Sequence, residues 1–138
     1  MFVTTAPRSA SNAYRQVGVE TGVSAASAHQ LVEMLFEGFF DSVAQARGAL
    51  QAGNIELKGR AIGRAVRIVD EGLRAGLNLK DGGEIAANLH RLYGYVALRL
   101  TEANLRNDAT ALEECVQLIE PVRSAWQQIA PNAAAKPQ

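Results

Sequence analysis

Two histidines, His29 and His90, are the side chains best suited to metal binding or phosphoryl transfer. A di-iron site in a helical bundle needs a glutamate three residues before a histidine on facing helices. Alanine stands at that place before both His29 and His90. A phosphotransfer protein would need an exposed histidine with a lysine nearby, and His90 has no such neighbour in sequence. We therefore interpret both histidines as surface residues rather than ligands.

The sequence also shows no clear nucleophile and no phosphate-binding loop. The single cysteine, Cys115, lies between Leu112 and Val116 in a helical pattern, which favours a small buried hydrophobic residue over a reactive thiol. The pair Gly82-Gly83 fits a turn and a helix cap, not a nucleotide-binding motif. The sequence leaves open whether folding brings a serine or cysteine next to a histidine. We expect no catalytic residue, no metal and no cofactor, and so a protein that binds rather than reacts.

Composition narrows the class of partner. The 138 residues contain 14 lysines and arginines and 14 acidic residues, so the formal net charge is zero. This balance argues against nucleic-acid binding, which leaves an excess of positive charge. We find no apolar run long enough to span a bilayer and no export signal, which predicts a cytoplasmic protein without membrane insertion.

Apolar residues repeat at three- and four-residue spacing along most of the chain, which predicts helices. The segments run from about 28–51, 54–80, 82–106 and 109–130. Ser27 with Gln30 and Asp81 with Glu84 form candidate capping boxes, while Asn54, Asn107 and Asp108 are candidate caps. Four long helices with short turns predict an all-α fold, an antiparallel up-down four-helix bundle. We expect a flexible N-terminal arm over 1–23, the bundle over 24–130 and a disordered tail over 131–138.

The third helix carries two apolar stripes. The main stripe, which should close the core, consists of Ile85, Leu89, Leu92, Val96, Leu100 and Ala103. A weaker stripe on roughly the opposite side consists of Ala87, Gly94, Leu98 and Leu105. A helix that only closes a core needs one stripe, so the second stripe predicts a partner.

The second helix has an apolar arc wider than a core requires. Leu57 and Ile68 alternate there with small residues such as Ala61, which predicts a shallow groove. A well-buried helix edge would give the same pattern.

Several short motifs follow one another in a characteristic order. They are Ala13-Tyr14, Ala26-Ser27-Ala28-His29-Gln30-Leu31, Met34-Leu35-Phe36-Glu37-Gly38, Lys58-Gly59, Ile62-Gly63-Arg64-Ala65, Gly82-Gly83-Glu84-Ile85-Ala86, Leu92-Tyr93-Gly94-Tyr95, Ala103-Asn104 and Arg123-Ser124-Ala125-Trp126. Together they resemble the FliS family of flagellin-export chaperones over nearly the whole ordered chain.

The resemblance implies a cytoplasmic chaperone that binds the disordered C-terminal segment of flagellin. It would prevent premature polymerisation and help deliver flagellin to the flagellar type III export apparatus, with one flagellin per chaperone. In this family the client wraps around the bundle, and the N-terminal arm covers part of that surface when it is empty. Tyr14 and Val17 would then form a displaceable plug. Leu57, Ala61, Ile68, Gly94, Leu98 and Leu105 are our other partner-binding candidates.

Three alternatives stay open. The same surface could bind another partner, such as a flagellar export gate or regulatory protein. The second stripe could instead form a homodimer, which sizing at several concentrations would detect. An enzyme would need a metal or cofactor that analysis of the pure protein would reveal.

Overall fold

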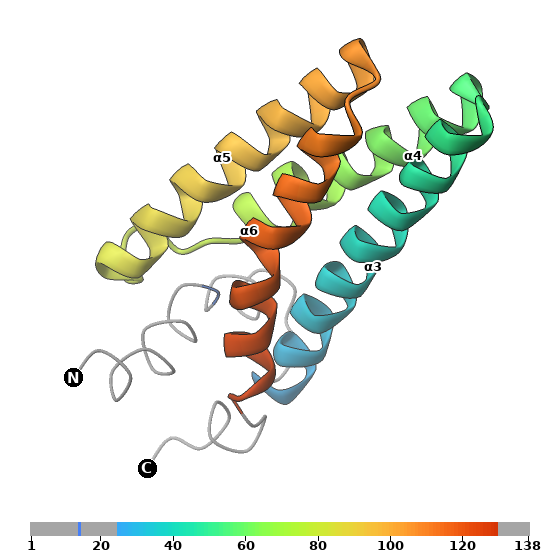
Figure 1. Ribbon diagram of the computed structural model, residues 1–138. Helices are drawn as coiled ribbons and strands as arrows, with labels where there is room; N and C mark the ends of the chain where they lie inside the picture. The colour runs from blue at the N-terminus through green and yellow to red at the C-terminus, as the bar shows by residue number, and fades with distance from the viewer. Residues whose placement is uncertain (1–13, 15–24, 130–138) are drawn as a thin grey trace.

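The computed structural model describes Tyr14 and residues 25–129, and these residues form four helical segments (Figure 1). Helix α3 spans Ala25–Ala52, and α4 spans Ile55–Arg67. A π-helical segment, η1, continues α4 over Ile68–Arg74. Helices α5 and α6 span Gly83–Arg106 and Ala109–Gln127. The expected arm over 1–23, apart from Tyr14, and the expected tail over 131–138 lie outside the described residues.

The helices follow one another up and down around a shared core. Helix α3 packs against α4, α4 and η1 pack against α5, and α6 packs against both α5 and α3. Figure 1 shows successive helices running in opposite directions, and no strand occurs in the described residues. The prediction of an all-α antiparallel four-helix bundle is confirmed. None of the described helices is long and apolar enough to cross a membrane.

Two of the predicted helix caps are present. The side-chain oxygen of Asn54 accepts a hydrogen bond from the backbone N–H of Leu57 at 3.1 Å. The Asp108 carboxylate accepts from the N–H groups of Thr110 and Ala111 at 2.9 and 3.2 Å. Both side chains satisfy donors that have no partner inside the first turn of a helix. Of the two candidates before the last helix, Asp108 is therefore the cap.

The two predicted capping boxes are wrong. Helix α3 begins at Ala25, so Ser27 lies inside its first turn rather than before it. Helix α5 has Gly82 as its N-cap without a side-chain hydrogen bond, and Gly83 has a φ of 65°. Glycine adopts this left-handed conformation without strain. The backbone N–H of Asp81 instead donates to the side chain of Asn78 at 3.0 Å, so Asn78 organises this turn.

The second helix was predicted over 54–80 but ends earlier, at Arg74. Its last part, from Ile68, is π-helical. The N–H of Ala75 donates to the carbonyl of Asp70, five residues back, at 3.1 Å. This segment lies against α3 at close range: a Cβ on Gly72 would be 2.9 Å from Leu35 Cδ2. Hydrophobic spacing predicts a helix here but does not distinguish its α-helical part from its π-helical part.

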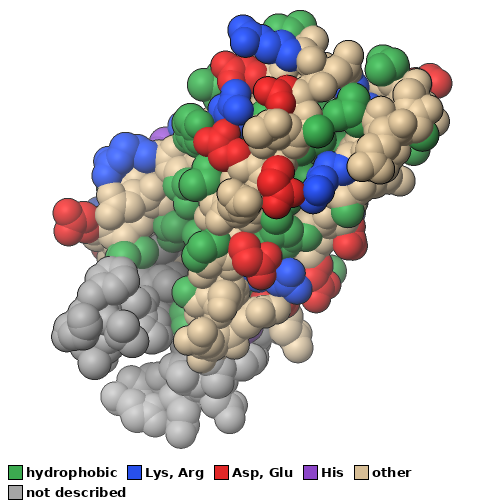
Figure 2. Space-filling model, in the orientation of Figure 1, with side chains coloured by type: hydrophobic (Ala, Val, Ile, Leu, Met, Phe, Trp, Pro, Cys, Tyr) green, Lys and Arg blue, Asp and Glu red, His purple; other side chains and the backbone are tan. Residues whose placement is uncertain are grey.

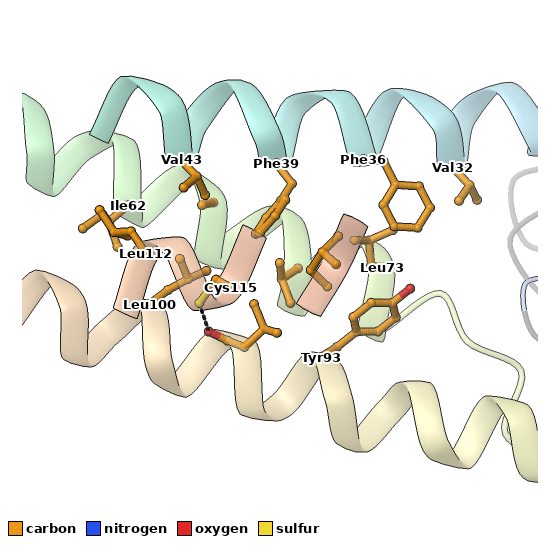
Figure 3. Close-up of a cluster of buried hydrophobic side chains, with 14 of the residues drawn as sticks. Val32, Phe36, Phe39, Val43, Ile62, Leu73, Tyr93, Leu100, Leu112 and Cys115 are labelled. Atoms are coloured by element: carbon orange, nitrogen blue, oxygen red, sulfur yellow. Dashed lines mark hydrogen bonds between the residues drawn. The ribbon is translucent and has the colours of Figure 1, made fainter. Parts of the chain in front are cut away.

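The core draws large side chains from all four helices (Figure 3). In α5, Val96, Leu100 and Ala103 are buried as the main stripe predicts. Nearer the start of α5, Ala86 and Tyr93 are buried, whereas Ile85, Leu89 and Leu92 are only half-buried. The buried side of the first half of α5 is thus turned by about one residue from the predicted stripe. The fully buried large side chains are Tyr93, Phe36, Phe39, Ile62, Leu73, Leu100, Leu112, Ile119, Val32, Val43, Val69 and Val96.

A buried lysine holds the end of α5. The Lys58 ammonium donates to the backbone carbonyl of Asn104 at 2.8 Å and to the side-chain oxygen of Asn107. Asn107 ends α5 in a left-handed conformation, with a φ of 53°. A cation at a helix C-terminus also interacts favourably with the helix dipole. Lys58 therefore fixes the C-terminal end of α5 to α4.

We expect Lys58→Met to lower the free energy of unfolding by about 1–3 kcal/mol, because two partly buried hydrogen bonds of the Lys58 ammonium are lost. The matched control is Arg60→Met, an exposed cation on the same helix, which should stay within about 0.5 kcal/mol of the parent. Urea unfolding at neutral pH measures both values. Equal midpoints for the two variants would contradict the role of Lys58.

Candidate partner-binding site

Tyr14 is buried at one end of the bundle, far in sequence from the residues that surround it. Its side chain is 3% exposed, and its hydroxyl donates to the hydroxyl of Tyr93 at 2.5 Å. Its ring meets Trp126 edge-on, with centroids 5.5 Å apart and planes at 75°. We call the place formed by Tyr93 and Trp126 the Tyr14 seat. Tyr14 is thus docked on the bundle, while Val17 lies outside the described residues.

His29 packs against Trp126 and so supports the Tyr14 seat. The rings of His29 and Trp126 stack at 4.7 Å with an interplanar angle of 14°. The indole N–H of Trp126 donates to the His29 carbonyl at 3.2 Å, and His29 Nε2 lies 3.1 Å from the Trp126 carbonyl. The interpretation of His29 as a surface residue is wrong, because this stack leaves it 8% exposed. His90 is half-buried.

Burial sets the electrostatics of the two phenols. It raises the pKa of Tyr14 well above its usual value, and the neighbouring Tyr93 raises it further. Burial also raises the pKa of Tyr93, although accepting the hydrogen bond from Tyr14 opposes this. Figure 3 shows Tyr93 projecting from α5 into the end of the core where Phe36 and Val32 of α3 lie. Both phenols are therefore neutral groups in an apolar environment at neutral pH.

The second stripe of α5 is partly free. Leu98 and Leu105 are 55% and 78% exposed, as a partner-binding surface requires. Gly94 is half-buried, because the Arg74 guanidinium lies over it; a Cβ there would be 3.0 Å from one Arg74 nitrogen. Arg74 in turn pairs with Asp70 at 3.1 Å. The partner-binding role of Leu98, Leu105 and Gly94 stays a prediction.

The candidates on the second helix lie elsewhere. A Cβ on Gly38 of α3 would be 3.1 Å from Ile68 Cδ1, so Ile68 faces α3. Ala61 was expected outside the core but is 3% exposed within it, and Leu57 is half-buried. On its other side η1 meets α5, where Arg74 lies over Gly94. Whether the three contact a partner stays a prediction.

Polar side chains cover the surface where α5 and α6 meet. Glu114 accepts from the Tyr95 hydroxyl at 2.6 Å and from Arg99 Nε at 2.8 Å. Both hydrogen bonds lower the pKa of the Glu114 carboxyl, and the one from Tyr95 has the larger effect. Figure 2 shows charged side chains interleaved with hydrophobic ones on the face of the molecule in view. This surface is mixed rather than a single charged patch.

The described residues give little support for catalysis or metal binding. Burial raises the pKa of the Cys115 thiol to about 12, which confirms its interpretation as a buried hydrophobic residue. No group of three metal-binding side chains comes together in the part of the chain described here. What the structure does assemble is an aromatic seat with an occupant from the N-terminal segment.

Sequence reasoning missed Tyr93, which forms part of this seat, and His29, which packs against it. Both occur in the quoted motifs, but helical spacing placed neither of them in the core. Tyr14 is 79 residues from Tyr93, and His29 is 97 residues from Trp126. Spacing along one helix carries no signal for contacts of this range.

The seat predicts a particular response to alkaline pH, testable in the variant Tyr95→Phe, whose only tyrosines are Tyr14 and Tyr93. Unfolded tyrosines titrate near pH 10. The folded state holds both protons above that pH, so stability is fully present below pH 10 and falls as the pH rises further. Absorbance at 295 nm and urea unfolding between pH 8 and 11.5 measure the two effects. A phenol that ionises near pH 10 in the folded protein would show that Tyr14 is not seated.

Comparison with known proteins places this architecture in a family. The sequence model of the family described as "Flagellar protein FliS" matches residues 10–133. The chain is 50% identical over 122 residues to the Flagellar secretion chaperone FliS of Salmonella typhimurium, covering 88% of this chain and 90% of that protein. It is 40% identical over 125 residues to the protein of that name from Vibrio cholerae, covering 91% of each. It is 45% identical over 113 residues to Flagellar secretion chaperone FliSB of Pseudomonas aeruginosa, covering 82% of this chain and 89% of that one. The chain therefore belongs to the FliS family of flagellar secretion chaperones.

Proposed function

We propose that this protein binds the C-terminal segment of newly made flagellin in the cytoplasm, keeps it from polymerising and aids its delivery to the flagellar export apparatus. One molecule of each would form the complex, and no catalytic step is involved. The observation that carries the proposal is the Tyr14 seat, an aromatic site whose occupant comes from outside the bundle. Export gate or regulatory proteins would bind the chaperone–flagellin complex.

The Tyr14 seat suits a site that is covered until a client arrives. Tyr14 packs against Tyr93 and Trp126 and belongs to none of the bundle helices, so its release would remove no helix from the bundle. A disordered segment that folds on binding must offset its ordering cost with a large contact area. Displacing one side chain while covering a longer surface meets that requirement, as in other complexes where an amphipathic helix lies in a groove.

The exposed leucines of α5 offer a second apolar surface. Leu98 and Leu105 lie five and twelve residues beyond Tyr93 on the same helix but on another face, since Tyr93 is buried and both leucines are exposed. A single exposed leucine is common on protein surfaces and needs no explanation. Leu98 and Leu105, however, lie on one stripe of α5, which an amphipathic segment can cover. We therefore place the client along α5 from the Tyr14 seat towards Leu105.

Titration calorimetry of the purified protein with monomeric flagellin tests the function. We expect saturable one-to-one binding to full-length flagellin and none to flagellin that lacks its C-terminal segment. Tyr14→Ala should strengthen binding, because the client no longer competes with Tyr14. Tyr95→Ala, a tyrosine on α5 with an exposed side chain, is the matched control and should not strengthen it. Absence of binding to full-length flagellin would refute the proposal.

Two charge substitutions compare an exposed residue of α5 with a half-buried residue that faces α3. Leu98→Glu should change the free energy of unfolding by no more than about 0.5 kcal/mol but weaken flagellin binding about tenfold or more. Ile68→Glu should cost about 2 kcal/mol or more of stability, because it puts a charge against Gly38 of α3. Met34→Glu, on an exposed apolar residue of α3, is the control for Leu98. Unchanged binding in Leu98→Glu would remove that residue from the client surface.

A further inference from the structure

We infer that the Tyr14 seat selects its occupant by a hydrogen bond: the client segment brings a neutral hydrogen-bonding group to the Tyr93 hydroxyl. This rests on the proposed function and specifies the chemistry of the client at one point. The group is a hydroxyl, a side-chain amide or a main-chain amide at the tip of an otherwise apolar contact. A purely aliphatic or unsubstituted aromatic occupant would fill the space but leave the hydroxyl unpaired.

The first step of the argument is that Tyr93 depends on the occupant. The Tyr93 side chain is fully buried in the core. Among the described residues, its hydroxyl hydrogen-bonds to Tyr14 alone. A buried polar group that loses its partner costs more free energy than the hydrogen bond itself contributed. When Tyr14 leaves, an occupant that does not hydrogen-bond to the Tyr93 hydroxyl therefore binds less favourably by that free energy.

The second step is that the Trp126 indole N–H and the His29 Nε2 atom of the neighbouring aromatic pair are already engaged. The Trp126 indole N–H is bonded to the His29 carbonyl, and the Trp126 carbonyl is bonded to His29 Nε2. Turning either group towards Tyr93 would break a buried hydrogen bond of the pair. The His29–Trp126 pair therefore does not replace Tyr14 as a partner for the Tyr93 hydroxyl.

The third step concerns charge. The Tyr93 phenol is neutral, and hydrophobic side chains of the core surround it. A carboxylate or ammonium placed here would lose its hydration without a countercharge, which is unfavourable. A neutral donor or acceptor pairs with a phenol in either direction, because the hydroxyl both donates and accepts. The chemistry of the seat therefore favours the same kind of group that Tyr14 presents.

The test uses the Tyr14→Ala background, in which the original occupant no longer competes. Full-length flagellin is titrated into Tyr14→Ala and into Tyr14→Ala/Tyr93→Phe, with the single tryptophan, Trp126, as a fluorescent reporter inside the seat. The double variant should bind about five- to tenfold more weakly, the effect of one buried hydrogen bond. The control Tyr14→Ala/Tyr95→Phe removes a phenol hydroxyl outside the seat and should bind like Tyr14→Ala.

The possible results separate the two proposals. Equal affinities for Tyr14→Ala and the Tyr93→Phe double variant would overturn the inference, since water or nothing would then pair with Tyr93. Weaker binding in the Tyr93→Phe variant with an unchanged Tyr95→Phe control would support it. Failure of flagellin to bind any variant, or the parent, would refute the proposed function itself. Thermal melting of both double variants shows that the comparison is between folded proteins.

Discussion

The reciprocal contact between His29 and Trp126 is the constraint on which the Tyr14 seat depends. It joins a residue near the start of α3 to one near the end of α6, and these two ends lie side by side in the bundle (Figure 1). The stack fixes the plane of the Trp126 ring, so that Tyr14 meets it edge-on. Loss of this pair would leave Trp126 free to turn and the seat without a defined wall.

A seat with one anchoring side chain among the residues that the structure describes suits exchange. Burial of a side chain of this size contributes a few kcal/mol at most, about 1.5–3 for comparable residues. A client that covers Trp126, Tyr93 and further surface on α5 can exceed that value and shift the population to the open state. Several deeply buried anchors would raise the cost of opening beyond what one disordered segment can offset. The hydrogen bond to Tyr93 adds selectivity without adding much apolar area.

The fold was predictable because it follows from local rules, and the site was not. Helical spacing gave four helices, and Asn54 and Asp108 cap theirs because a side chain needs to reach only two or three residues ahead. The same rule failed at Asp81, where Asn78 and a left-handed Gly83 organise the turn instead. Helical spacing alone does not decide which face of a helix packs inward, so Ala61 of α4 and Tyr93 of α5, both placed outside the core, are buried. Contacts of Tyr14 and His29 across most of the chain leave no trace in local spacing.

The two ends of α5 are held in different ways, and this difference bears on function. At its C-terminal end, Lys58 donates to the Asn104 carbonyl and to the Asn107 side chain, and Asp108 caps α6 directly after it. This end is therefore fixed by residues of the bundle itself. Nearer its start, α5 lacks a side-chain cap, and the buried hydroxyl of Tyr93 is paired with a residue from outside the bundle. The exchange proposed above would therefore alter packing in the first half of α5 and leave its C-terminal end intact. A chaperone that must take up and release a client without unfolding needs this separation of its fixed end from its exchangeable end.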